Sequence, residues 1–300
     1  MKTCTPNFLL VGASKSGTSS IYHYLRQHPQ IFLSPFQKEG RFFSGMEACF
    51  QGPGDDHIQR SIPAHWEDYL RLFLGYQGEA IVGDISPEYL YHYEKAIPRI
   101  QKHLGEDVKI AIILRNPIER AYSQYLHYVR DERETLNFSE ALEAEDQRQV
   151  EKWLWSWAYA RSGLYYNQVK AYKDHFKNVR IFLYDSFKQN PENFLKSLCI
   201  FLKIDSTFEF DISYKYNVSG IPKNKLLYRV ERNRSLVHIL KVLIPTPIIN
   251  WMKYTWTGEK RKIKKTMPLE AKTKLIEFYK TDVQKLQILL NEDLSHWFRI

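Results

Sequence analysis

The chain has 300 residues, 44% of them hydrophobic and 15% aromatic, which is enough apolar material for one large α/β domain with a substantial core. It holds no run of 18 apolar residues, and its three cysteines are scattered, so the sequence predicts no transmembrane helix, disulfide framework or zinc site. The formal net charge of +9 arises in one late region.

The first predicted unit is a strand, a tight loop and a helix. Phe8–Val11 is an apolar run typical of a buried strand, and apolar residues recur at helical spacing from Ile21 onward. Gly12 and Gly17 enclose a loop of the form G-x-x-x-x-G that contains Lys15. The N–H groups of such a loop converge with the helix N-terminus, so this unit predicts a P-loop-like anion site.

The loop departs from that of nucleotide triphosphate enzymes. In those enzymes a lysine and a Ser or Thr follow the second glycine, whereas this chain has Thr18 and Ser19 there and its lysine at position 15. A P-loop nucleotide kinase therefore stays an alternative, but it lacks the usual lysine. Asp84 is the one carboxylate at a predicted strand end that could serve its magnesium ion.

Strands and helices then alternate along the first two thirds of the chain. We expect further strands at residues 31–33, 80–83, 108–114 and 179–184. We expect helices at residues 66–73, 95–103, 117–130, 137–146, 150–157, 164–175, 191–202 and 268–290. This alternation is typical of a parallel sheet with helices on both faces. We therefore predict a single α/β domain over residues 1–300.

Polar residues follow the first four predicted strands. Lys15 to Ser20 follow the first strand, Lys38 and Glu39 the second, Asp84 the third and Arg115 the fourth. Ligands of doubly wound sheets bind at the carboxyl ends of the strands, so we expect these side chains to meet in one crevice.

Four segments carry a resemblance to a known family. They are Ala13-Ser-Lys-Ser-Gly-Thr-Ser-Ser20, Lys38-Glu-Gly-Arg-Phe-Phe43, Asp84-Ile-Ser-Pro-Glu-Tyr89 and Arg115-Asn-Pro-Ile-Glu-Arg-Ala-Tyr-Ser123. In this order they resemble the PAPS-dependent sulfotransferase family, in particular its bacterial members and the branch with the heparan sulfate sulfotransferases. The resemblance runs from about residue 7 to residue 225, and the last helix also resembles family members.

The resemblance implies transfer of the sulfuryl group of 3′-phosphoadenosine 5′-phosphosulfate (PAPS) to a hydroxyl or amine, without a metal ion. Glu39 would be the general base, and Lys15 would neutralise the leaving phosphate. Asp84 would assist Glu39 or orient Lys15. The implied donor-binding residues are Lys15, Ser16, Gly17, Thr18, Ser19 and Ser20 for the 5′-phosphate, Arg115 and Ser123 for the 3′-phosphate, and Lys223 in a late loop.

Each assignment has a structural alternative. Glu39 could form a loop ion pair with Lys38 or Arg41, Arg115 could pair with an acid, and Asp84 could be a turn carboxylate. Some relatives have a lysine where this chain has Ile85. His28 and His127 are expected at the surface or in packing. An aromatic group could stack on a sugar or simply pack: Phe42, Phe43, Trp153, Trp155 and Trp157.

The basic excess lies between Lys215 and Lys265, where 13 Lys and Arg residues accompany two acidic residues. The whole C-terminal region, about 215–300, is expected to be basic and partly helical. It leaves open a second alternative, a non-catalytic basic module that binds an acidic glycan. The acceptor is open, with a glycan as one candidate, and so is the oligomeric state. We expect no nucleic-acid partner, no signal peptide and a cytoplasmic location.

Overall fold

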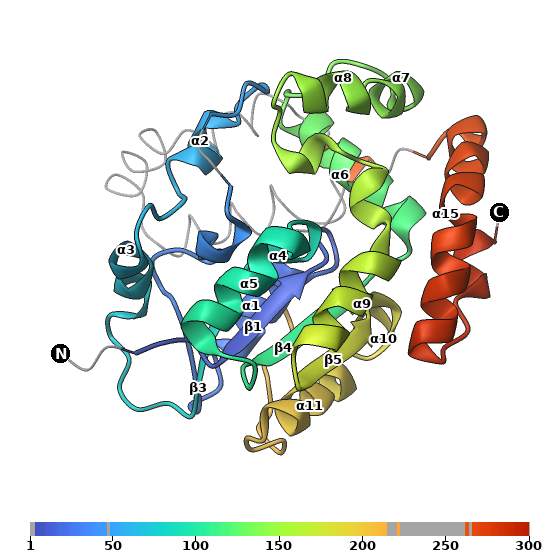
Figure 1. Ribbon diagram of the computed structural model, residues 1–300. Helices are drawn as coiled ribbons and strands as arrows, with labels where there is room; N and C mark the ends of the chain where they lie inside the picture. Colours follow the sequence, from blue (N-terminus) through green and yellow to red (C-terminus); the bar gives the residue numbers. More distant parts are fainter. Residues whose placement is uncertain (1–3, 47–48, 215–220, 223–261, 264–265, 300) are drawn as a thin grey trace, which may run out of the picture.

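Five parallel strands form the central sheet, in the order β2–β3–β1–β4–β5 (Figure 1). Their bounds are Ile31–Leu33 for β2, Ile81–Ile85 for β3, Phe8–Gly12 for β1, Lys109–Leu114 for β4 and Asn178–Leu183 for β5. The strand order reverses between β1 and β4, and at such a point the carboxyl ends of two strands leave a crevice for a ligand. The predicted α/β fold with a central parallel sheet is confirmed.

The computed structural model describes residues 4–46, 49–214, 221–222, 262–263 and 266–299. Within these residues, β6 (Ile221–Pro222) and β7 (Lys262–Ile263) form a short antiparallel pair. The predicted site residue Lys223 and most of the basic region 215–265 lie outside the described residues.

The apolar run of β1 is continuous because both faces of the sheet are covered. Leu9 and Val11 belong to one buried cluster, whereas Phe8 and Leu10 belong to the other. All four side chains have an exposed fraction of 0%. A strand alternates its side chains between the two faces, so a central strand of such a sheet must be apolar at every position.

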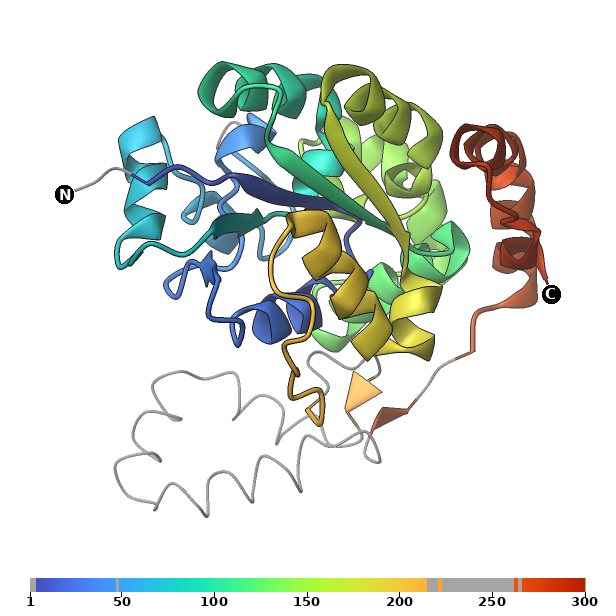
Figure 2. The same cartoon turned by 90° about the horizontal axis from the view of Figure 1, so that it is seen from below.

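Two groups of helices supply these clusters (Figure 2). The larger group comprises α4 (Glu88–Tyr91), α5 (Tyr93–Leu104), α6 (Pro117–Arg130), α9 (Tyr165–His175) and α15 (Leu269–Leu290). The smaller group comprises α1 (Thr18–Leu25), α10 (Tyr184–Gln189) and α11 (Pro191–Leu202). The short helices α2 (Asp56–Gln59), α3 (Trp66–Leu70), α7 (Phe138–Glu143) and α8 (Glu145–Val150) complete the α-helices of the described chain. In that part of the chain no helix has both the length and the apolar character needed to cross a bilayer.

Helix α6 starts where the sequence predicted it. The side chain of Asn116 accepts hydrogen bonds from the N–H groups of Ile118 and Glu119, and Pro117 occupies the first helical position. Both features stabilise a helix N-terminus, the first by satisfying unpaired donors and the second by presetting φ. The start of α6 thus lies directly behind Arg115, at the end of β4.

The long closing helix α15 packs beside α9 and α6. The hydroxyl of Tyr279 donates to the carbonyl of Ala160 at 2.7 Å, and the carboxylate of Asp282 accepts the N–H of Tyr165 at 2.8 Å. The predicted helix at 268–290 is therefore confirmed and belongs to the domain that carries the sheet.

The helix predicted at 150–157 is wrong. Helix α8 ends at Val150, and only Trp155–Trp157 forms a 3₁₀ turn, η3. The N–H of Trp153 turns back to the carbonyl of Arg148 at 2.9 Å, and Lys152 takes a positive φ of 59°. The N–H of Leu154 then donates to the buried carboxylate of Asp55, a long-range bond that competes with helix formation.

Two further differences concern helix boundaries. The helix predicted at 137–146 is two helices, α7 and α8, which meet at Ala144. Helix α10 was not predicted, because the apolar residues of its six-residue stretch are too few to establish a period.

Candidate active site

The loop between β1 and α1 has the geometry of an anion site. Gly17 is the N-cap of α1 with a φ of 80°, and no side chain caps this helix end. A Cβ on Gly17 would lie 2.9 Å from the ring of Phe187, so the position favours glycine for conformation and for space. The uncapped N–H groups at the start of α1 can therefore serve a ligand.

The hydroxyls of this loop are buried or engaged beside the helix end. Ser16 has an exposed fraction of 0%, and its Oγ has no hydrogen-bond partner in the structure. The Oγ1 of Thr18 accepts a hydrogen bond from Nζ of Lys38 at 3.1 Å. Since a buried hydroxyl normally has a partner, the orphaned Ser16 fits a loop that closes around a phosphate group.

Lys15 lies at the centre of a cluster of charges. Its Nζ is 3.0 Å from Nδ1 of His127, and Nε2 of His127 is 3.4 Å from a carboxylate oxygen of Asp131. Removal from water, reinforced by the positive charges of Arg130 and Arg115, lowers the pKa of Lys15 to about 7. This amine is poised to gain a proton when an anion approaches.

His127 connects Lys15 with helix α6. Burial, and then the charge of Lys15, lowers the pKa of His127 to about 4, so its ring is neutral at pH 7. A neutral ring protonated at Nε2 accepts a hydrogen bond from Lys15 and donates one to Asp131. The sequence predicts His127 and His28 as surface or packing residues rather than bases. His127 is partly buried and contacts Lys15, a contact that the sequence did not predict. His28 packs 4.8 Å from the ring of Phe208.

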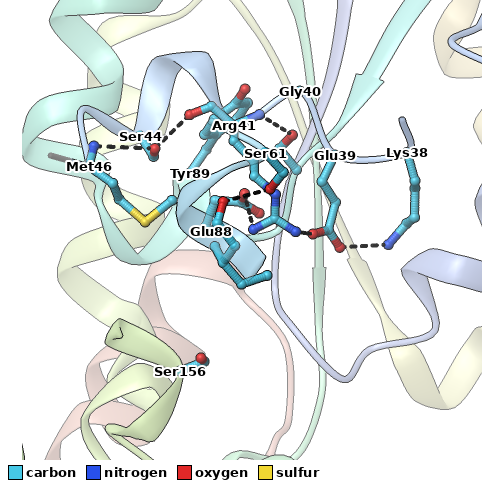
Figure 3. A network of polar contacts seen from close by, with 12 residues as sticks. Lys38, Glu39, Gly40, Arg41, Ser44, Met46, Ser61, Glu88, Tyr89 and Ser156 are labelled. Carbon is cyan, nitrogen blue, oxygen red and sulfur yellow. Dashed lines mark hydrogen bonds and ion pairs between the residues drawn. The ribbon is translucent and has the colours of Figure 1, made fainter. Parts of the chain in front are cut away.

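Glu39 lies between two cations in the loop after β2 (Figure 3). Its Oε1 is 3.2 Å from Nζ of Lys38, and its Oε2 pairs with Nη2 of Arg41. Burial alone would raise the pKa of Glu39, but the two cations together hold it below its usual value. The ion pairs considered from the sequence are both present. They hold the carboxylate beside the phosphate loop, because Lys38 also contacts Thr18.

Asp84 lies near the carboxyl end of β3 and anchors the loop that carries Glu39. Its exposed fraction is 3%, and its carboxylate accepts four hydrogen bonds. The donors are the N–H of Gly40 at 3.0 Å and the hydroxyls of Ser86, Tyr69 and Tyr89 at 2.6, 2.9 and 2.7 Å. The contact with Gly40 links Asp84 to the residue that follows Glu39.

The approach of this loop to β3 requires glycine at position 40. A Cβ there would lie 2.5 Å from Oδ2 of Asp84 and 2.6 Å from the ring of Tyr69. Ile85, the position where some relatives carry a lysine, is fully buried in the cluster on the α1 face of the sheet. Its side chain contributes to the core.

Arg115 and Ser123 were predicted to bind a second phosphate. The Nη1 of Arg115 donates to the carbonyl oxygen of Lys15 at 3.0 Å, and its Nε and Nη2 contact Glu119 at 3.3 and 3.0 Å. Glu119 is half-exposed, so its pairing with Arg115 is a weak, solvent-screened contact that an incoming phosphate can displace. Ser123 lies on α6, the helix that also carries Glu119, and its exposed fraction is 7%.

Most of the aromatic residues considered for stacking on a sugar belong to the hydrophobic core. Phe42, Phe43 and Trp157 are buried in the larger cluster. Trp155 is partly buried, and its ring stacks on that of Tyr91 with centroids 5.4 Å apart. Packing therefore accounts for the first three rings.

Sequence reasoning missed the supporting charges of the site. Lys38 was expected in the crevice, but Arg41 entered the sequence analysis only as a possible loop ion pair of Glu39. His127 and Asp131 have one sequence signal, a spacing of four residues at the end of the helix that follows Arg115. Within the described residues, no group of three or more His, Cys, Asp or Glu side chains is arranged to hold a metal ion.

Curated relatives match part of the chain. A membrane-associated sulfotransferase, kil1, from Dictyostelium discoideum is 32% identical over 41% of this chain and 23% of its own length. The bifunctional heparan sulfate N-deacetylase/N-sulfotransferase 2 of Bos taurus is 32% identical over 42% of this chain and 13% of its own length. The chain thus matches less than a quarter of these relatives.

A solved structure and a family model cover more of the chain. The crystal structure of a sulfotransferase from Alicyclobacillus acidocaldarius is 34% identical, with a TM-score of 0.78, over 99% of this chain and 100% of that one. The model of the sulfotransferase family matches residues 6–209, a range that contains the loop of Lys15, Glu39, Asp84 and Arg115. On this sequence and structural evidence, the chain belongs to the sulfotransferase family.

Proposed function

We propose that this protein transfers the sulfuryl group of PAPS to a hydroxyl or amine of its acceptor, with Glu39 as the general base. One observation carries the proposal. Nζ of Lys38 lies within 3.2 Å of both Thr18 Oγ1 and Glu39 Oε1, so a single cation joins the phosphate loop to the base. A donor held by that loop and an acceptor held at Glu39 would meet at Lys38.

The residues present fit the two phosphate groups of the donor. The uncapped start of α1 and the orphaned hydroxyl of Ser16 suit the 5′-phosphate. Arg115, which already contacts the carbonyl of Lys15, suits the 3′-phosphate as a bidentate donor, together with the hydroxyl of Ser123 on helix α6, which begins two residues after Arg115. A role for Lys223 in donor binding stays a prediction, because this residue lies outside the described residues.

The chain's own groups divide the chemistry between them. Glu39 takes the proton of the acceptor as the acceptor oxygen or nitrogen forms its bond to sulfur. The bond from sulfur to the phosphate oxygen breaks at the same time, and protonated Lys15 stabilises the charge that develops on that oxygen. Asp84 acts as a positioning residue, since it holds Gly40 and with it the Glu39 loop.

The two alternatives fare differently. Family membership favours sulfuryl transfer over a P-loop kinase. The alternative of a non-catalytic basic module depends on residues 215–265, most of which lie outside the described residues. It is tested by measuring whether the protein binds an acidic glycan in a salt-sensitive manner. A carbohydrate acceptor is our choice, because relatives include a heparan sulfate N-sulfotransferase and carbohydrate sulfotransferase 15.

The donor is tested by thermal-shift titration with 3′-phosphoadenosine 5′-phosphate (PAP), beside ATP with magnesium. At 100 times its dissociation constant, PAP should stabilise the fold by about 2.7 kcal/mol. Arg115→Ala should abolish most of this shift. An equal shift with ATP would favour the kinase instead.

The base and the acceptor class are tested by radiolabelled sulfate transfer from PAPS to N-deacetylated heparosan and to simple phenols. Glu39→Gln should keep the PAP-induced thermal shift and lose transfer about 10²-fold or more. The matched control is Glu67→Gln, which changes an exposed glutamate on α3 and should transfer at the wild-type rate. Full activity of Glu39→Gln would remove Glu39 as the base.

A further inference from the structure

A second carboxylate stands behind Glu39 (Figure 3). Glu88 is the first residue of α4, and its exposed fraction is 1%. Its Oε1 lies 3.3 Å from Nη1 of Arg41, and the other terminal nitrogen of the same guanidinium pairs with Glu39. One cation is thus shared by two carboxylates, one at the site and one buried.

The buried carboxylate of Glu88 has an unused hydrogen-bond acceptor. Its Oε1 has no hydrogen-bond partner, so the contact with Arg41 is an ion pair without hydrogen-bond geometry. Burying a carboxylate oxygen without hydrogen bonds is costly, and such groups persist where they serve a function or bind a proton. Burial, only partly offset by Arg41, raises the pKa of Glu88 to about 7.

Arg41 is anchored at its backbone, and its side chain is largely buried between the two acids. Its N–H donates to Oγ of Ser86 at 3.2 Å. Its side chain is only 12% exposed. A buried guanidinium that faces two acids interacts with both, so a change of charge on one acid alters the proton affinity of the other.

We propose that Glu88 is a positioning residue that sets the proton affinity of Glu39 through their shared partner Arg41. Ionised Glu88 competes with Glu39 for the positive charge of Arg41 and adds a negative charge near the site. Both effects raise the proton affinity of Glu39. Protonated Glu88 leaves Arg41 to Glu39 alone and makes Glu39 a weaker proton acceptor. This inference rests on the proposed role of Glu39 as the base.

Other charged groups also lie near Glu39 and Glu88 and contribute to their electrostatics. Lys38 contacts Glu39 from the same loop, and Asp84 lies behind Glu88 on β3. The hydroxyl of Tyr89, next to Glu88 on α4, is occupied as a donor to Asp84. Lys38 pairs with Glu39 alone, whereas Arg41 pairs with both glutamates, so Arg41 is the cation that the two carboxylates share.

The test is an infrared pH titration of the full-length protein without donor or acceptor. The carboxyl band that disappears in Glu88→Gln identifies Glu88, and its pH dependence gives the proton affinity of this group while Glu39 is ionised. The coupling between two titrating groups is mutual, so the effect of Glu39 on Glu88 measures the effect of Glu88 on Glu39. Glu39→Gln should lower the proton affinity of Glu88 about tenfold, because Arg41 then pairs with Glu88 alone. Arg41→Gln should raise it about tenfold or more, because the paired cation is lost.

Opposite shifts of the proton affinity in the two variants distinguish this coupling from damage to the fold. Damage to the fold would shift the proton affinity in the same direction in both variants, or in neither. In the Arg41→Gln background, Glu39→Gln should have a smaller effect on the Glu88 titration, since only the direct repulsion between the two carboxylates remains. The matched control is Glu145→Gln. Burial also raises the pKa of Glu145 to about 7, but this carboxylate accepts from the N–H groups of Ala160 and Arg161. The Glu88 band should not move in this control.

An unchanged Glu88 titration in Glu39→Gln overturns the proposal, and so does an equal shift in the Glu145 control. The function is judged separately, by the pH profile of sulfate release from PAPS with water as the acceptor. If the infrared shift is present but the rate profile does not follow it, the coupling stands and Glu39 is not the base.

Discussion

Donor binding should be accompanied by uptake of a proton at Lys15. The pKa of Lys15 is lowered to about 7, first by its removal from water and then by the charges of Arg130 and Arg115. A phosphate group placed against this amine reverses the shift, because an opposite charge at close range favours the protonated form. Binding and protonation are therefore linked.

The size of the uptake follows from that pKa. At pH 8, a free amine with a pKa of about 7 is about 10% protonated, so binding of PAP should take up about 0.9 proton. At pH 6 the amine already carries its proton, and uptake at Lys15 should fall to about 0.1. Above pH 7 the dissociation constant of PAP should rise about tenfold for each pH unit, which corresponds to about 1.4 kcal/mol.

The assay is isothermal titration calorimetry at pH 8 in buffers with different heats of ionisation, where the slope of the observed heat gives the number of protons. At pH 8 the phosphates of PAP are already ionised, so they contribute little. Lys15→Arg is the matched control, since arginine stays charged and should bind PAP without proton uptake. Zero uptake in the wild type, or equal uptake in Lys15→Arg, would refute this account of Lys15.

Three more predictions concern stability, loop geometry and pH. Arg148→Met should destabilise the fold by about 3–5 kcal/mol in chemical denaturation, because Glu134, whose side chain is 1% exposed, loses its ionic partner; Arg60→Met, in an exposed pair with Asp56, should cost less than about 1 kcal/mol, and equal losses would contradict the burial argument. Gly40→Ala should keep PAP binding but lose sulfate transfer about 10²-fold, because its Cβ would overlap the Asp84 carboxylate and displace the Glu39 loop; unchanged transfer would show that the loop position is not needed. An NMR titration should find the ring of His127 neutral down to about pH 4, so this group supports stability above pH 6.5 and loses that contribution as pH falls through 4, whereas a midpoint near 6.5 would exclude the buried contact with Lys15.

Elements with strong local signals were predictable. The apolar run of β4 and the Asn116-Pro117 start of α6 depend on neighbouring residues, and both occur as predicted. The break after Val150 was not predictable, since it depends on a bond from Leu154 to Asp55, which lies 99 positions away. Local pattern cannot report a competitor so distant in the chain.

By itself the sequence determined the alternation of strands and helices, the glycine loop around Lys15 and the polar residues at the strand ends, because each of these is a property of adjacent residues. Only the tertiary structure decided how those residues are held. Asp84 reaches Gly40 across 44 positions and Lys15 reaches His127 across 112, while Arg41 joins Glu39 to a glutamate on another element. Such contacts depend on which chain segments the parallel sheet brings together, and so do the burial and charge that set the pKa values of the site.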